Sequence, residues 1–380
     1  MRTRKLIPFL AACLALVGIQ AVLAATPAAA VPKGPRAPTS VVAVGVNRTI
    51  GVSWKAPSNL GRSPITGYTA SATAGAVTKT CHGGAAALSC SVLGLTNGTT
   101  YTVNVYSTNV WGNSPTTASL IKATPSTTQN CKYFGPWANL QNCQLTARNL
   151  RNADLTFANL AGAVLANADL VNANLDNTNL TKAVLTNADL GLATLFNAIL
   201  TNANLTSASL AIANLTNAGL TNANLTNANL AQAKLGNAKL TGAILTGITS
   251  GGTTGIHVVL PTNWRLVKGY LIGPAANLSG VDLSNTNLTN ADMSNAILTG
   301  ANLTSAILNN VNLSGALLNG ANLTDATLGN ADLTGAQLVG TNLTGAKFTD
   351  ANLTGVLWLS TICPDGSIAT VPQTCIGHGI

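Results

Sequence analysis

Leucine occupies every fifth position of a long stretch of the chain, from Leu140 to Leu245 without exception, which makes 22 in a row. The same spacing resumes at Leu278 and continues to Trp358, with Met293, Phe348 and Trp358 as the only centres that are not leucine. Alanine stands two places before the central residue in nearly every copy. The fold therefore has to bury one large and one small apolar residue in each group of five.

Neither regular secondary structure buries such a pattern. On an α-helix, successive leucines rotate by about 140° and form no common face. On a flat strand an odd period sends successive leucines to opposite sides. A backbone that turns by about a quarter circle every five residues points each leucine at one axis, with the preceding alanine on the same side. That alanine has to be small because four leucines already crowd each coil. The pattern thus predicts a solenoid whose coils are stable only when stacked and capped.

The consensus of the repeat is Ala-Asn-Leu-Thr-Asn, and residues 223–227 and 301–305 are good copies. This consensus resembles the pentapeptide-repeat family. The resemblance implies a right-handed quadrilateral β-helix over residues 131–360, with four repeats to a coil and runs at 138–247 and 276–360. At ~4.8 Å between coils, the stack is expected to be roughly 45 to 50 Å long.

The two runs differ in phase, because Leu245 and Leu278 are not separated by a multiple of five. Residues 248–275 between them form an irregular bracket, in which 256–260 and 264–272 are expected to be strands. We favour one continuous stack over two independent solenoids. Tyr133, Phe134 and Trp137 precede the regular repeats, and residues 361–380 follow them, so both ends are expected to be capped.

Residues 38–123 show short alternating runs separated by turn residues, at 40–46, 49–54, 66–72, 87–93 and 100–109. Trp54 lies in the second run, Tyr68 in the third, and residues 95–101 and 109–114 supply a Leu-to-Tyr approach and an Asn-to-Ser turn. In these features the segment resembles a fibronectin type III domain. The expected fold class is therefore all-β: a fibronectin type III β-sandwich followed by a quadrilateral β-helix.

The first 30 residues have the form of an export signal, with Arg2, Arg4 and Lys5 before an apolar run and small residues after it. A retained membrane helix over residues 6–25 and a lipoprotein box ending at Cys13 are alternatives. A Pro-rich leader at 31–37 follows the signal. A polar linker at 124–130 is expected to couple the two domains loosely.

Six cysteines remain after the signal and fall into three short-range couples: Cys81 with Cys90, Cys131 with Cys143, and Cys363 with Cys375. We predict three local disulfides in an oxidising compartment, the first of them across a hairpin and the last closing a C-terminal cap. Neither the cysteine spacing nor the three separated histidines suggests a metal site, and no cofactor is predicted.

Only 8% of the residues are charged, and glutamate is absent. The formal charge of +9 comes from the region before the repeats, since from residue 131 onward nine Lys and Arg face ten Asp. Some pentapeptide-repeat proteins resemble duplex DNA in charge and bind topoisomerases, but that mechanism needs dense negative charge. A basic groove for nucleic acid is equally unsupported.

Two groups of side chains are candidates for chemistry. Residues 20 apart are expected to stack, so Asp169 should lie next to Asp189, and Asp292 should lie two coils from Asp332 on the same face. Such pairs of carboxylates could act as the catalytic acids of a glycosidase, or they could simply replace Asn on the surface. The bracket holds the densest set of varied side chains, which forms either an interaction patch or internal packing: His257, Trp264, Arg265, Lys268 and Tyr270.

The leading hypothesis is an exported, non-enzymatic bacterial protein, secreted or at the cell surface, that binds a protein or a cell-envelope polymer. It has no membrane span once the signal is removed. A topoisomerase-binding DNA mimic and an extracellular hydrolase accessory protein are the alternatives.

Overall fold

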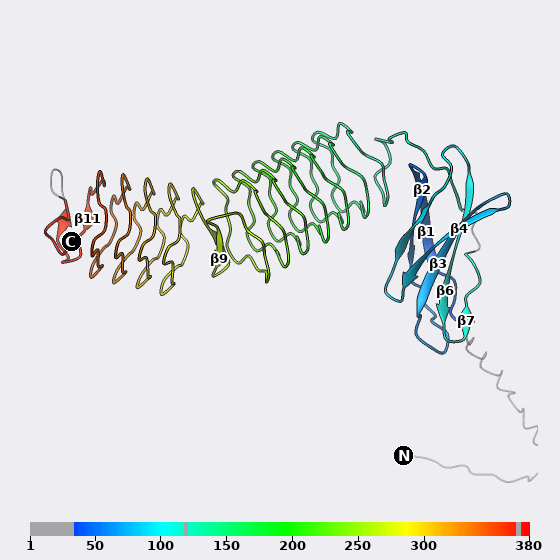
Figure 1. Ribbon diagram of the computed structural model, residues 1–380, viewed down its shortest axis with the longest axis horizontal. Coiled ribbons are helices and arrows are strands. Elements are labelled where there is room, and N and C mark those ends of the chain that lie inside the picture. Colours follow the sequence, from blue (N-terminus) through cyan, green and yellow to red (C-terminus); the bar gives the residue numbers. More distant parts are fainter. Residues whose placement is uncertain (1–33, 118–120, 370–373) are drawn as a thin grey trace, which may run out of the picture.

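The computed structural model describes residues 34–117, 121–369 and 374–380. A β-sandwich lies at one end of the molecule and a long rod of stacked coils extends from it (Figure 1). The predicted signal at residues 1–30 lies outside the described residues. Within the described ranges, no helix has the length and apolar character needed to cross a membrane.

The sandwich has two antiparallel sheets. One sheet contains β1 (Thr39–Val46), β2 (Thr49–Lys55) and β5 (Ser89–Leu93), in that order. The other has the order β4 (Val77–Gly84), β3 (Gly67–Ala74), β6 (Tyr101–Asn109), β7 (Gly112–Asn113), and β8 (Ile121–Ala123) also pairs with β6. Strand β6 alternates buried and half-buried residues along its whole length, so its period of two places one face in the core.

Two aromatic residues fill the sandwich core as the sequence predicts. Trp54 and Tyr68 are 4% and 3% exposed, and their ring centroids lie 5.4 Å apart. The Tyr101 hydroxyl accepts a hydrogen bond of 3.1 Å from the Thr96 N–H, which fixes the loop before β6. All five predicted strands are present, with boundaries shifted by one or two residues.

The sequence prediction missed β4 and misplaced the first disulfide. Strand β4 is almost entirely solvent-exposed, so it lacks the alternation that marks its neighbours. The Cys81–Cys90 disulfide is present, but Cys81 lies in β4 and Cys90 in β5, which belong to different sheets. The expectation of a bond across a hairpin is therefore wrong, and the bond instead joins the two sheets at one side of the sandwich.

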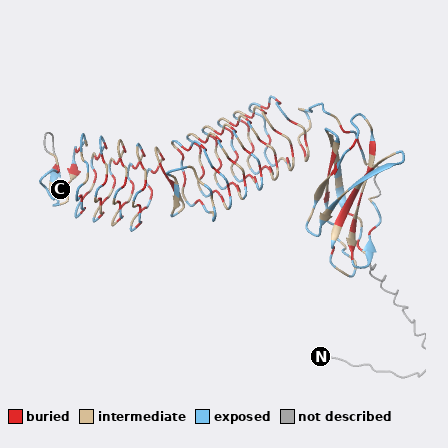
Figure 2. Cartoon of the chain, viewed as in Figure 1, coloured by how far each residue is buried: buried red, intermediate tan, exposed pale blue. Residues whose placement is uncertain are grey.

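The rod is a β-helix in which residues 20 apart are paired by parallel bridges, beginning with Asn139 and Asn159. The central leucines are 0% to 4% exposed, except the partly buried Leu353, and nearly all the alanines two places earlier are also buried. Figure 2 shows the resulting alternation of buried and exposed residues along every coil. Hydrogen bonds such as Leu140 N–H to Asn159 O, at 2.8 Å, connect each coil to the next. Four repeats to a coil are thus confirmed.

The residue before each central leucine, such as Asn224, occupies what we call the face position. Every Asn or Asp there, except Asn139, accepts a hydrogen bond of 2.9 to 3.2 Å from the N–H two residues later. A threonine after the leucine adds a second bond, as Thr226 Oγ1 does to Asn224 Oδ1 at 2.6 Å. The consensus Asn and Thr therefore close each corner of the coil.

The second residue after each central leucine, such as Asn227, occupies the corner position and has a positive φ of 52° to 70°. Asn and Gly predominate at these corners because they tolerate the left-handed region best. Stacked asparagines add hydrogen bonds between coils, as Asn217 Nδ2 does to Asn197 Oδ1 at 3.0 Å.

The bracket differs in part from its prediction. The bridges of the first run continue through Thr254 and Val259, so residues 256–260 belong to a coil and the expected strand there is wrong. Residues 264–272 form a hairpin instead of one strand, with β9 (Arg265–Val267) paired to β10 (Tyr270–Ile272).

The hydrogen-bonded stack crosses the bracket, but the apolar core divides there. Thr249 in the bracket is bridged to Asn229 of the first run and to Asn277 of the second. Leu271 packs in the core of the first run, whereas its neighbour Ile272 packs in the core of the second. The rod is therefore continuous in its backbone ladder and has two apolar columns inside.

Disulfides lie at both ends of the rod. Cys131–Cys143 closes the first coil, where the Arg148 guanidinium also lies 4.7 Å from the centre of the Phe134 ring. Cys363–Cys375 closes the last segment, which contains the short pair β11 (Thr361–Ile362) and β12 (Ile368–Ala369). All three predicted cysteine pairs are confirmed.

Candidate interaction sites

The predicted patch in the bracket is largely engaged in holding the hairpin to the second run. The Arg265 guanidinium donates to the carbonyls of Thr289 and Asn290, each at 2.9 Å. The Lys268 ammonium donates to the Ser284 carbonyl at 2.6 Å. These contacts assign both cations a structural role, because each satisfies backbone oxygens of the following coil.

The other three members of the patch do not form one surface. Trp264 is partly buried against both apolar columns, and its ring covers Gly273. Tyr270 is half-buried beside Gly251. His257 is exposed at a corner with a φ of 55°, and within the described residues no hydrogen bond joins it to the other four. An interaction role for this patch remains a prediction.

The stacked carboxylates are tied into the backbone. Asp169 accepts from the Val171 N–H at 3.1 Å and forms an ion pair with Arg151 at 3.1 Å. Asp189 accepts from the Gly191 N–H at 2.9 Å. Asp292 and Asp332 close their corners in the same way. These groups replace Asn at the face position, and the structure gives them no further partner that would suit acid or base chemistry.

Hydrogen bonds at these corners also lower the pKa of several carboxyls. The pKa of Asp282 is lowered chiefly by the Ser284 hydroxyl, and that of Asp332 chiefly by the Thr334 hydroxyl. Both donors stabilise the charged form. Within the described residues, no cluster of three or more His, Cys, Asp or Glu could hold a metal ion.

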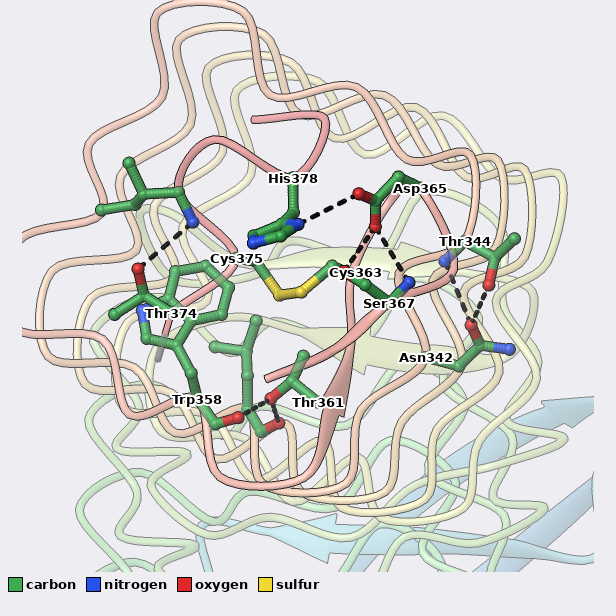
Figure 3. The surroundings of a disulfide bond; sticks show 12 residues. Asn342, Thr344, Trp358, Thr361, Cys363, Asp365, Ser367, Thr374, Cys375 and His378 are labelled. Atoms are coloured by element: carbon green, nitrogen blue, oxygen red, sulfur yellow. Dashed lines mark hydrogen bonds and ion pairs between the residues drawn. A yellow bond between two sulfur atoms is a disulfide. The ribbon is translucent and has the colours of Figure 1, made fainter. Parts of the chain in front are cut away.

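The C-terminal cap repeats this chemistry beside its disulfide (Figure 3). Asp365 accepts from the Ser367 hydroxyl at 2.6 Å and lies 3.2 Å from the His378 imidazole. The pKa of Asp365 is lowered mainly by the Ser367 hydroxyl, with a smaller contribution from His378. Buried Thr361 donates to the Leu338 carbonyl at 2.6 Å and so fixes the cap on the preceding coil.

The junction between the sandwich and the rod is a site that sequence reasoning missed. The Trp137 ring, at the first corner of the rod, lies directly against Gly51 of β2, where a Cβ would come within 2.1 Å of the ring. Trp137 also stacks on Phe157 of the next coil, with centroids 4.4 Å apart and planes 5° apart. The domains are thus in direct contact, which the prediction of loose coupling did not include.

An uncharged cleft of about 510 Å³ opens at this junction; we call it the junction cleft. Its walls come from the end of β1 and from the first two coils, and include Asn47, Trp137, Asn139, Gln141, Phe157 and Asn159. A signal for it was present in the sequence, since Trp137 and Phe157 occupy corners at which the repeat elsewhere prefers Asn or Gly. Their meeting with β2 was not predictable from the sequence.

Comparison with known proteins agrees with this architecture. The model of pentapeptide repeats matches residues 138–177, 173–211, 208–247, 276–315 and 316–356. The model of the fibronectin type III domain matches residues 36–122. The chain has no match among the curated proteins with which it was compared.

Solved structures similar to the rod include two pentapeptide-repeat proteins. HetL from the cyanobacterium Nostoc, a protein involved in regulating heterocyst differentiation, is 34% identical over 60% of this chain and 91% of its own, with a TM-score of 0.34. A thylakoid-lumen protein from Arabidopsis thaliana is 33% identical over 25% of this chain and 67% of its own, with a TM-score of 0.25. The chain itself belongs to the pentapeptide-repeat family and carries a fibronectin type III domain before its repeats.

Proposed function

We propose that this protein is exported and acts without catalysis, as a rigid rod with a fibronectin-type module that binds a protein or a cell-surface polymer. The observation that carries the proposal is the placement of the three disulfides. One staples the sandwich and one closes each end of the rod. Disulfides in these positions are typical of proteins that fold in an oxidising compartment.

The surface chemistry supports binding to an uncharged or weakly charged partner. Nine cationic and ten anionic side chains are distributed along residues 131–380, so the rod has no strong field. Its faces and corners present mainly amides and hydroxyls, many of which already close turns. Such a surface offers many hydrogen bonds and little electrostatic steering.

Two measurements test the proposal. N-terminal sequencing of the protein recovered outside the cytoplasm should find a start within residues 25–31, because the signal is removed on export. The mature protein should then sediment with an envelope fraction or capture a partner from it. Recovery of uncleaved protein in the cytosol, together with inhibition of DNA supercoiling, would instead support the DNA-mimic alternative. Hydrolysis that is lost in Asp169→Asn would support the enzymatic one.

A further inference from the structure

Three large apolar side chains are exposed at the end of the sandwich that lies away from the rod. Val110 and Trp111 are the two turn residues between β6 and β7, and they are 72% and 55% exposed. Leu60 lies in the loop between β2 and β3 and is 43% exposed. Figure 1 shows β7 at the end of the sandwich opposite to the segment that enters the rod. We call these three residues the apolar tip.

The side chain of Asn109 holds the two parts of the apolar tip together. Its Nδ2 donates to the carbonyls of Leu60 and Ser63 at 3.0 and 3.2 Å. Its Oδ1 accepts from the Trp111 N–H at 2.9 Å. Asn109 is only 3% exposed, so water does not easily replace these bonds between the turn and the loop. The apolar tip is therefore one rigid surface of the kind that marks an interaction site, and binding through it requires little ordering of the backbone.

The region around the apolar tip is cationic. Arg62 follows Leu60 by two residues, and the Arg36 N–H donates to the carbonyl of the residue before Leu60; both arginines are exposed. No carboxylate side chain of the sandwich opposes them, because residues 34–123 contain six Lys and Arg and neither Asp nor Glu. Residues 154–380, in contrast, contain six Lys and Arg against ten Asp. The sandwich therefore attracts anions, whereas most of the rod does not.

The apolar and cationic properties together decide the class of partner. Trp favours the interface of a lipid bilayer, aliphatic side chains enter its acyl region, and cations are attracted by anionic headgroups. A soluble polyanion could pair with the arginines but would leave the apolar tip in water. A neutral apolar partner would offer the arginines no counter-charge. A two-residue turn is also convex, so it can enter a deformable surface but encloses no small ligand.

We propose that the apolar tip docks the protein on an anionic lipid surface. Leu60, Val110 and Trp111 enter the interface between headgroups and acyl chains, where aromatic and aliphatic side chains are both favoured. Arg36 and Arg62 contact the lipid phosphates. This inference goes beyond the proposed function, because it adds a membrane contact that is separate from the capture of a protein or polymer.

The test is binding of the mature chain to lipid vesicles. Residues 1–30 are absent from it, so the apolar run of the predicted signal cannot insert. The wild-type protein should sediment with vesicles of phosphatidylglycerol and phosphatidylcholine, and it should stay in solution with phosphatidylcholine alone. Val110→Ser with Trp111→Ser should weaken this binding by about tenfold, because less apolar area enters the interface. Arg36→Gln with Arg62→Gln should weaken it by about tenfold at low ionic strength and reduce its salt dependence.

Fluorescence distinguishes insertion from attraction by charge alone. In anionic vesicles with brominated acyl chains, the tryptophan emission of the wild type should be quenched on binding, and that of Trp111→Phe should not. Leu192→Ser with Lys234→Gln is the matched control, because it removes one exposed apolar side chain and one exposed cation from the rod. This control should bind vesicles as the wild type does. All the altered side chains are exposed, so each variant should remain folded, which thermal melting checks.

Failure of the wild type to bind anionic vesicles overturns the inference. Equal binding to neutral vesicles, binding that the two serine substitutions leave unchanged, or quenching that persists in Trp111→Phe overturns it as well. Capture of a protein or polymer from a detergent-treated envelope fraction tests the proposed function without lipid, so either proposal can fail while the other stands.

Discussion

The two runs of the rod have cores of the same composition and differ at their corners. Each buries a leucine every five residues at close to zero exposure. In the first run most corners are asparagines, and Asn177, Asn197, Asn217 and Asn237 form a continuous ladder of side-chain hydrogen bonds. In the second run glycine occupies eight corners: Gly280, Gly300, Gly315, Gly320, Gly335, Gly340, Gly345 and Gly355. The corners of both runs have the same backbone geometry, so either asparagine or glycine can occupy it.

These solutions have different energetic consequences. Glycine takes a positive φ without steric strain, but it gains more conformational freedom on unfolding. Asparagine is strained at a positive φ, but its side-chain hydrogen bonds to the coils on either side offset that cost. The first run also carries bulky side chains at its corners, among them Leu192 and Ile212, which are about half exposed. The asparagine-rich run therefore holds strained residues that do not occur at the corners of the second run.

The largest effect is expected from opening the apolar columns. Leu205→Ala in the first run and Leu313→Ala in the second should each cost about 3 kcal/mol, because both leucines are fully buried. Since the columns divide between Leu271 and Ile272, each variant should accelerate amide exchange chiefly in its own run. Exchange that rises equally in both runs would show that the rod unfolds as one unit.

A smaller effect should separate the two corner chemistries. Asn217→Ala should cost about 2 kcal/mol, since it removes one bond given to Asn197 and one received from Asn237 and leaves alanine at a positive φ. Gly320→Ala should cost about 1 kcal/mol, because a Cβ there meets no atom within 4 Å and only the backbone is strained. Chemical denaturation of both variants measures the difference; equal losses would show that the ladder adds nothing.

Relief of backbone strain in the first run should raise stability, whereas the preceding substitutions lower it. Ile212 has a φ of 62°, which a β-branched residue rarely adopts, so Ile212→Asn should raise stability by about 1 kcal/mol. Ser207→Asn is a suitable control, because a small polar residue already occupies that corner. A loss of stability in Ile212→Asn would indicate that the exposed isoleucine makes a contact worth more than its strain.

The smallest effect is expected on the stability of the second run at low pH. Hydrogen bonds lower the pKa of Asp282 and Asp332 in the folded second run below the ordinary value of 3.8. The stability that these bonds contribute is present above pH 3.8 and is lost as the pH falls through the folded-state pKa. Asp282→Asn with Asp332→Asn should therefore flatten the acid limb of a melting-temperature profile, measured between neutral pH and pH 2. An unchanged acid limb would contradict the assignment of these bonds.

Prediction from sequence succeeded where a pattern repeats and failed where it is unique. The central leucines and the alanines two places before them could be placed inside the rod, because a period of five fits neither a helix nor a flat strand and is buried by a coil that turns every five residues. The bracket was predicted less well, since residues 256–260 keep the coil conformation although Ser250 and Gly255 replace leucine. Strand β4 escaped detection because nearly all of its side chains face solvent. The only feature of the junction cleft that the sequence revealed was the unusual pair of aromatic residues at corner positions, Trp137 and Phe157.

The sequence by itself indicated the fold class and four repeats to a coil, through the resemblance of its repeats and of its first domain to known families. It also indicated the pairing of the cysteines, because the three couples are close together along the chain. The tertiary structure alone decided how the sandwich meets the rod. Gly51 and Trp137 are 86 positions apart, and only the fold brings the bare backbone of one under the ring of the other. Near this contact the indole N–H of Trp137 and the side-chain carbonyl oxygen of Asn139 are buried without partners, which no local pattern encodes, because whether a polar atom is satisfied depends on all that surrounds it.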